Sequence, residues 1–132
     1  MTETQLHNLR LLDLENEWLS LSVLSEVGAK ILTLYDKVGN RQILWENPRI
    51  RPQSYPIDAN FDNYWCGGWD DAYPTADACI QAGEPSPNLG ELRSLHWQVE
   101  EASPNKTVMT AYAPISAIHA TKTICSPGKS CR

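Results

Sequence analysis

Residues 66–75 have the sequence CGGWDDAYPT, and residues 88–97 have the sequence NLGELRSLHW. The adjacent glycines at 67 and 68 allow the backbone to turn where a side chain would clash. Residues 76–87, between the two segments, are poor in hydrophobic residues and are expected to form an irregular loop, the usual place for a binding surface. Aromatic and charged side chains surround the glycines: Trp65, Trp69, Asp70, Asp71, Tyr73, Glu91, Arg93 and Trp97.

Five of these residues are candidates for binding a small polar ligand. A guanidinium such as that of Arg93 can grip two ligand oxygens at once, or it can form an ion pair with a nearby carboxylate. The two aspartates either contact the ligand or hold the glycine turn by accepting bonds from backbone N–H groups. The indole of Trp69 either stacks on the ligand or packs in the core. The candidates are Trp69, Asp70, Asp71, Glu91 and Arg93.

Upstream of this region, apolar and polar residues alternate with a period of two, which predicts half-buried strands. Strands are expected over residues 19–23 and 30–36. Residues 37–40 contain glycine and asparagine and predict a hairpin turn, after which residues 41–45 return antiparallel. The leucine-rich stretch over residues 6–14 is consistent with a strand or a short helix.

Downstream, residues 95–100, 107–113 and 116–124 are predicted strands, with Trp97 on an apolar face. Residues 46–60 contain three prolines, which cannot donate to a sheet ladder, so this segment is expected to be a loop. No segment shows a helical period. The fold class is therefore all-β and antiparallel, built from consecutive hairpins.

The 132 residues are expected to form one domain. A net charge of -5 argues against nucleic-acid binding, which needs a basic face. No apolar run is long enough to cross a bilayer, and the first residues do not resemble a secretory signal, so we expect a cytoplasmic protein. In that compartment free thiols are favoured over two disulfides or a zinc site, and no metal or other cofactor is expected. The cysteines are Cys66, Cys79, Cys125 and Cys131.

Residues 125–132 have no apolar periodicity. They are either a disordered, non-native tail or a sign that the chain stops part-way through its fold. All-β sandwiches commonly need roughly 200–250 residues, and an incomplete one exposes strand edges and apolar faces. We therefore expect an incomplete sandwich that associates with further copies of itself.

With these segments in place, the chain resembles the N-terminal part of proteins of the galactose mutarotase-like superfamily, and within it the aldose 1-epimerase-related proteins. Residues 28–34 and 39–45 resemble the family's early strand pair, and residues 67–74 and 90–94 resemble its two central motifs. The resemblance runs from about residue 17 to about residue 124 in the same order. It implies a large antiparallel β-sandwich (a supersandwich) with a sugar cleft on one sheet.

Members of this family that are enzymes interconvert the anomers of aldoses with a paired base and acid. The resemblance places the family's catalytic glutamate and histidine beyond residue 132. A family histidine is replaced by Leu89, whereas Arg93 matches an arginine that contacts the substrate in the sugar-phosphate branch. We therefore expect a small sugar or sugar phosphate as partner and leave isomerase activity open. The alternative is a structural or self-associating module without sugar binding.

Overall fold

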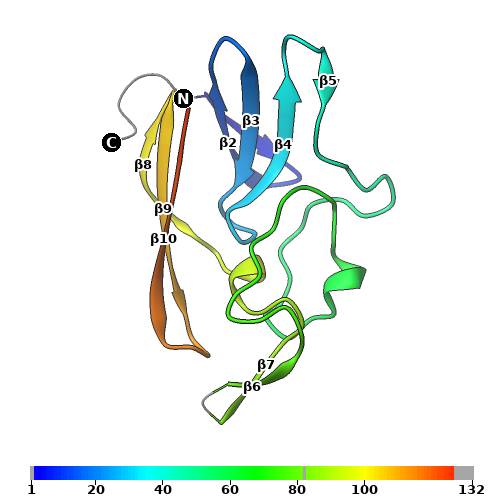
Figure 1. The fold of residues 1–132 in the computed structure, drawn as a ribbon, viewed down its shortest axis with the longest axis vertical. Helices are drawn as coiled ribbons and strands as arrows, with labels where there is room; N and C mark the ends of the chain where they lie inside the picture. Colours follow the sequence, from blue (N-terminus) through cyan, green and yellow to red (C-terminus); the bar gives the residue numbers. More distant parts are fainter. Residues whose placement is uncertain (1, 82, 127–132) are drawn as a thin grey trace.

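The structure, a computed structural model, describes residues 2–81 and 83–126 and is almost entirely β (Figure 1). Its larger sheet has five strands in the order in which they follow along the chain, and each pairs antiparallel with the next. The larger sheet comprises β1 (Thr2–Leu6), β2 (Leu9–Glu15), β3 (Leu19–Leu24), β4 (Lys30–Asp36) and β5 (Arg41–Gln42).

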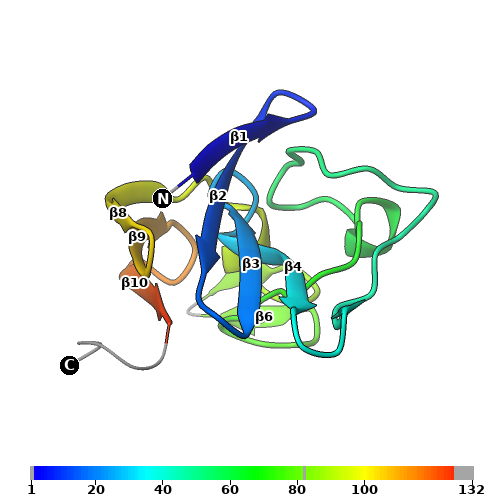
Figure 2. The same ribbon diagram turned by 90° about the horizontal axis from the view of Figure 1, so that it is seen from above.

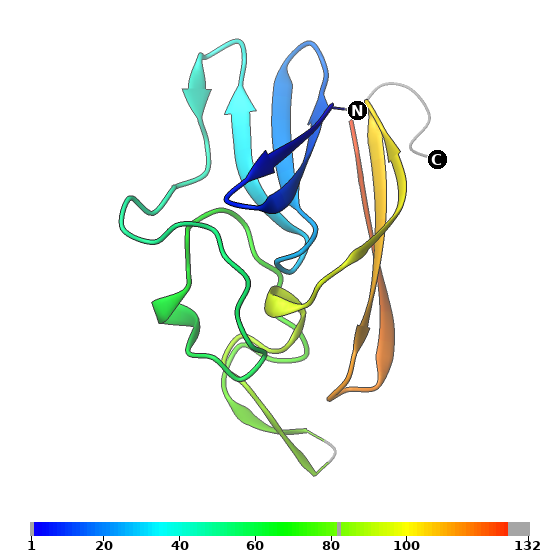
Figure 3. The same ribbon diagram turned by 180° about the vertical axis from the view of Figure 1, so that it is seen from behind.

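The second sheet has three strands in the order β10-β9-β8, again antiparallel. Its strands are β8 (Gln98–Ser103), β9 (Lys106–Ala113) and β10 (Ile118–Cys125). A small hairpin, β6 (Cys79–Gln81) with β7 (Glu84–Ser86), projects from the body of the molecule (Figure 3). Two single turns of 3-10 helix, η1 (Phe61–Asn63) and η2 (Leu92–Ser94), interrupt the connecting loops.

The two sheets face each other across one hydrophobic cluster, which makes the structure a sandwich (Figure 2). Leucines of β2 and valine of β3 meet Met109 and Ala113 of β9 there, together with the fully packed indole of Trp97. The expectation that Trp97 is a core residue is confirmed. Because the cluster joins strands from both sheets, the predicted all-β, antiparallel sandwich class is correct.

The opposite face of the larger sheet is covered by the long loop that follows β5. Tyr55 and Cys66 of this loop pack against Leu9, Leu24 and Leu32 in a second cluster. Residues 46–60 form no strand, as their prolines predict. The chain thus forms three layers, with the five-stranded sheet between the loop and the smaller sheet (Figure 2).

Several predicted elements differ from the structure. Residues 6–14 are neither one strand nor a helix, because His7 and Asn8 adopt positive φ and turn β1 into β2. Residues 76–87 are not an irregular loop, since they include the β6–β7 hairpin. Beyond Gln42 only isolated bridges continue the pairing, so the predicted strand over residues 41–45 is shorter. The strand predicted at residue 95 begins at Gln98.

The cysteines behave differently from one another. Cys66 is buried, and neither Cys66 nor Cys79 is part of a disulfide, as predicted. Cys125 is disulfide-bonded, so the prediction of a free thiol is wrong at this position. Cys131 and most of the predicted tail, residues 127–132, lie outside the described residues.

Candidate functional site

The two glycines of the central motif lie where three segments cross. Gly67 forms an isolated β-bridge with Glu46, and Trp69 forms one with Ile31 of β4. The motif therefore pairs with the larger sheet at single residues, without forming a regular strand. A Cβ at Gly67 would lie 2.2 Å from the carbonyl oxygen of Trp45, and one at Gly68 would lie 2.7 Å from that of Ile31. Both glycines have positive φ, so the close approach and the turn require glycine. We call residues 45–47 and 65–69 the glycine ribbon.

Asp70 follows the glycine ribbon and is paired with a buried lysine. Its carboxylate lies 2.9 Å from the ammonium of Lys30, which is 2% exposed and also donates to the carbonyl oxygen of Gly67. Burial raises the pKa of Asp70, whereas Lys30 and the indole of Trp65 act to lower that pKa. Neither carboxylate oxygen makes a hydrogen bond of normal geometry within the described residues.

Asp71 forms an ion pair with Lys122 of β10. Lys122 also donates to the carbonyl oxygen of Ala29 at 2.9 Å and lies over the ring of Trp97, 5.7 Å from its centroid. This lysine therefore joins the smaller sheet to the motif. One alternative for the two aspartates was that they accept hydrogen bonds from backbone N–H groups. In the structure they instead form ion pairs with lysines from distant strands.

Arg93 lies on η2 and its side chain is completely buried. Its guanidinium packs between the rings of Tyr55 and Phe61, at 5.4 Å from each centroid, and donates to the carbonyl oxygens of Asn88 and Ala59. Among the described residues, Nη1 has no hydrogen-bond partner and the guanidinium forms no ion pair with Asp70, Asp71 or Glu91. Arg93 thus connects η2 to the loop that contains Ala59, and the N–H groups of its Nη1 have no partner among the described residues.

Glu91 is also completely buried, and its carboxylate has an evident structural role. It accepts hydrogen bonds from the backbone N–H groups of Ile115 and Ser116, both at 2.9 Å, and from the hydroxyl of Ser116. These bonds fix the turn between β9 and β10. With its oxygens occupied in this way, Glu91 has little capacity left for a ligand.

An aromatic surface surrounds the glycine ribbon. Trp45, Trp65 and Trp69 are 55%, 36% and 54% exposed. The rings of Trp45 and Trp65 are 5.1 Å apart, and the ring of Phe61 lies 6.0 Å from that of Trp65. Trp69 is therefore not a core residue, and the core alternative for it is wrong.

The structure thus separates the five predicted residues by environment. Trp69 is itself exposed, Asp70 contacts Lys30 and Trp65, Asp71 is part of a link between sheets, and Glu91 and Arg93 are enclosed. Sequence reasoning missed Lys30 and Lys122, because a lysine in a strand pattern gives no local sign of a partner. It also missed the pairing of Trp45 with Trp65, which depends on the crossing at Gly67.

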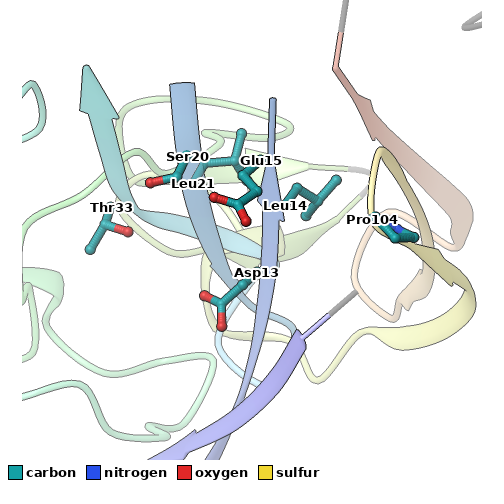
Figure 4. Close-up of a pocket in the computed structure, with 7 residues that line it drawn as sticks. All are labelled: Asp13, Leu14, Glu15, Ser20, Leu21, Thr33 and Pro104. Atoms are coloured by element: carbon teal, nitrogen blue, oxygen red, sulfur yellow. The ribbon is translucent and has the colours of Figure 1, made fainter. Parts of the chain in front are cut away.

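A cavity of about 380 Å³ lies over β2 and β3, bounded by Pro104 (Figure 4). Two of its polar side chains already have partners: Glu15 is paired with Lys37 at 2.7 Å, and the hydroxyl of Thr33 bonds that of Ser22. In the parts of the chain that the structure describes, no three His, Cys, Asp or Glu side chains converge to hold a metal ion. We therefore place the candidate site at the glycine ribbon.

No family model matches the sequence, and no curated protein is significantly similar to it. Solved structures do match. A galactose mutarotase-like protein from Lactobacillus casei superposes with a TM-score of 0.63 over 89% of this chain, at 15% identity. This chain has the galactose mutarotase-like fold. YeaD from Salmonella typhimurium, a candidate mutarotase, matches 82% of the chain with a TM-score of 0.55 and 22% identity.

The chain spans only 40% and 34% of the lengths of these two galactose mutarotase-like structures. Their identities to it are too low to transfer an activity, so the likeness establishes the fold and leaves the ligand to be argued from the site. Among all the residues that the structure describes, no helix is long and apolar enough to span a membrane.

Proposed function

We propose that this chain is a sugar-binding module that holds an aldose against the exposed indoles of the glycine ribbon. The observation that carries the proposal is the exposure of Trp45, Trp65 and Trp69 on adjoining segments. A contiguous exposed apolar surface, such as the paired rings of Trp45 and Trp65, often marks a binding site. A pyranose has an apolar C–H face that fits an indole, and hydroxyl groups at its rim that need hydrogen-bond partners.

Asp70 supplies those partners in this proposal. Its Oδ2 lies 2.9 Å from the ammonium of Lys30, and its Oδ1 has no hydrogen-bond partner among the described residues. A carboxylate accepts hydrogen bonds from hydroxyl groups, and such charge-assisted bonds are strong. Both carboxylate oxygens of Asp70 are buried, so a sugar hydroxyl can reach them only when a neighbouring side chain, such as the indole of Trp65, moves. Sugar binding is therefore expected to change the environment of a tryptophan.

The chain itself supports binding more directly than catalysis. Anomer interconversion needs a base that takes the proton of the anomeric hydroxyl and an acid that protonates the ring oxygen. At the glycine ribbon Asp70 is held by Lys30, and Glu91 is occupied by the β9–β10 turn. We therefore propose binding without anomer interconversion. The second candidate, a self-associating β module that binds no sugar, is favoured by the strand edge left open at β10.

Titration with glucose and galactose under tryptophan fluorescence tests the proposal. We expect saturable quenching in the wild type and its loss in Trp69→Ala, with Trp18→Ala as the matched control because Trp18 is also 54% exposed but lies on the β2–β3 turn. Polarimetry of freshly dissolved sugar should show no acceleration over buffer. Absence of quenching by both sugars would reject the proposal, and acceleration would reject its non-catalytic part.

A further inference from the structure

A second cavity, of about 430 Å³, lies between the β1–β2 turn and the loop that follows β5. Its walls include Glu46 and Cys66, the chain neighbours of Trp45 and Trp65. Its volume lies within the range of sites that hold small ligands. Because Glu46, Asn47 and Cys66 belong to the glycine ribbon, the cavity adjoins the proposed sugar site, but none of the three exposed indoles lines it.

The cavity carries an excess of positive charge. Arg49 and Arg51 line it together with the imidazole of His7, and the single carboxylate of Glu46 opposes them. Within residues 2–81 and 83–126, neither guanidinium has an ion-pair partner. The protein has a net charge of -5, so the local charge of this cavity is opposite in sign to that of the whole chain.

The loop that bears the two arginines is anchored on both sides. Asn47 accepts from the backbone N–H of Arg49 and donates to the carbonyl oxygen of Trp65, both at 2.9 Å. Ile50, between the arginines, packs against the second hydrophobic cluster, and Pro52 is buried. Anchoring of this kind reduces the entropy lost when the loop holds a ligand.

We propose that this cavity binds an anionic oxygen group, a phosphate or a carboxylate, carried by a small ligand. A guanidinium presents two parallel N–H donors that match either group. Two guanidinium groups on one fixed loop can bind the anion from two directions. This proposal goes beyond sugar binding and does not depend on it.

Isothermal titration of the whole chain with inorganic phosphate and, separately, with succinate tests the proposal at low ionic strength. We expect one of the two anions to bind at a single site. The double variant Arg49→Gln/Arg51→Gln should lose about tenfold or more in affinity, because hydrogen bonds to charged groups are strong. Arg41→Gln is the matched control, since Arg41 is exposed on β5 and faces Asp36 at 3.7 Å.

Binding of phosphate alone would assign a phosphate-bearing ligand, and binding of succinate alone a carboxylate-bearing one. Either result supports the anion site. Absence of binding by both anions, or an equal loss of affinity in Arg41→Gln and in the double variant, would overturn the proposal. In a second measurement, the bound anion should shift the backbone amide resonances of Arg49 and Arg51 in the wild type. Shifts confined to other segments would also overturn the proposal.

Discussion

Gly90 has a φ of +73°, and a Cβ there would lie 1.9 Å from the carbonyl oxygen of Tyr73. That carbonyl accepts a hydrogen bond from the backbone N–H of Glu91 at 2.7 Å, so residues 73 and 90 cannot move apart to make room for a Cβ without breaking this bond. We expect Gly90→Ala to lower the free energy of unfolding by several kcal/mol, or to prevent folding. Urea denaturation measures the effect.

Gly83 provides the matched control for this prediction. Its φ is +82°, but a Cβ there would have nothing within 4 Å. Gly83→Ala therefore retains only the cost of the left-handed backbone, about 1 kcal/mol. Equal losses in the two alanine variants would show that backbone conformation, and not the close approach to Tyr73, makes glycine necessary at residue 90.

Asp70 is the residue whose protonation should affect stability most clearly. Burial raises its pKa above the ordinary value of 3.8, so the folded state favours the protonated form. The stabilisation from this shift is fully present below the unfolded pKa and is lost as the pH rises through the folded pKa. We expect the wild type to lose unfolding free energy relative to Asp70→Asn between pH 3.8 and neutrality.

Urea denaturation of both proteins across this pH range measures the difference. The contribution of Lys30 is already part of this net shift, so the neutral Asn side chain should be tolerated beside its ammonium. A pH-independent difference between wild type and variant would mean that the pKa of Asp70 is the same in the folded and unfolded states.

The β9–β10 hairpin depends on a side chain from outside its own strands. Glu91 holds the turn through Ile115 and Ser116. We expect Glu91→Gln to cost about 2 kcal/mol, because one carboxylate oxygen becomes an amide group that meets a donor. Hydrogen exchange should accelerate at the two amides. Glu100→Gln is the control: Glu100 is exposed on β8 and accepts a hydrogen bond from the hydroxyl of Thr110.

The elements show where sequence reasoning succeeds and where it fails. Strands β3 and β4 and the turn over residues 37–40 were predictable because alternation and turn residues are local signals. The β1–β2 turn was hidden, since His7 and Asn8 lie within a leucine-rich run without glycine. The β6–β7 hairpin was hidden because its strands have three residues each and include Pro85.

The candidate site was predictable only in part for a related reason. The glycines, Trp69 and Asp70 are contiguous in the sequence, so their proximity needs no knowledge of the fold. Lys30 comes from β4 and Lys122 from β10, and only the assembled sandwich brings them to the motif. The enclosed positions of Glu91 and Arg93 likewise depend on the surrounding loops.

At the scale of the whole molecule, the edges of the smaller sheet remain to be accounted for. Among the described residues, β10 pairs with β9 on one side and has no partner on the other, and its lysine, Lys122, is bound to Asp71 and Ala29. The edge therefore lacks the free charge that commonly protects edge strands from pairing with other chains. Exposed indoles elsewhere on the surface add apolar area. We expect the chain to self-associate as its concentration rises.

Sedimentation equilibrium measures this association. Thr121→Lys/Thr123→Lys places two charges at exposed positions of β10 and should shift the protein towards the monomer. Ser54→Lys/Asn63→Lys adds the same charge at an exposed loop position and an exposed position of η1, away from β10, and should leave association unchanged. If both double variants dissociate equally, net charge and not the β10 edge governs assembly. A wild type that stays monomeric at high concentration would contradict the prediction, because an open edge of eight residues would then be stable without a partner strand.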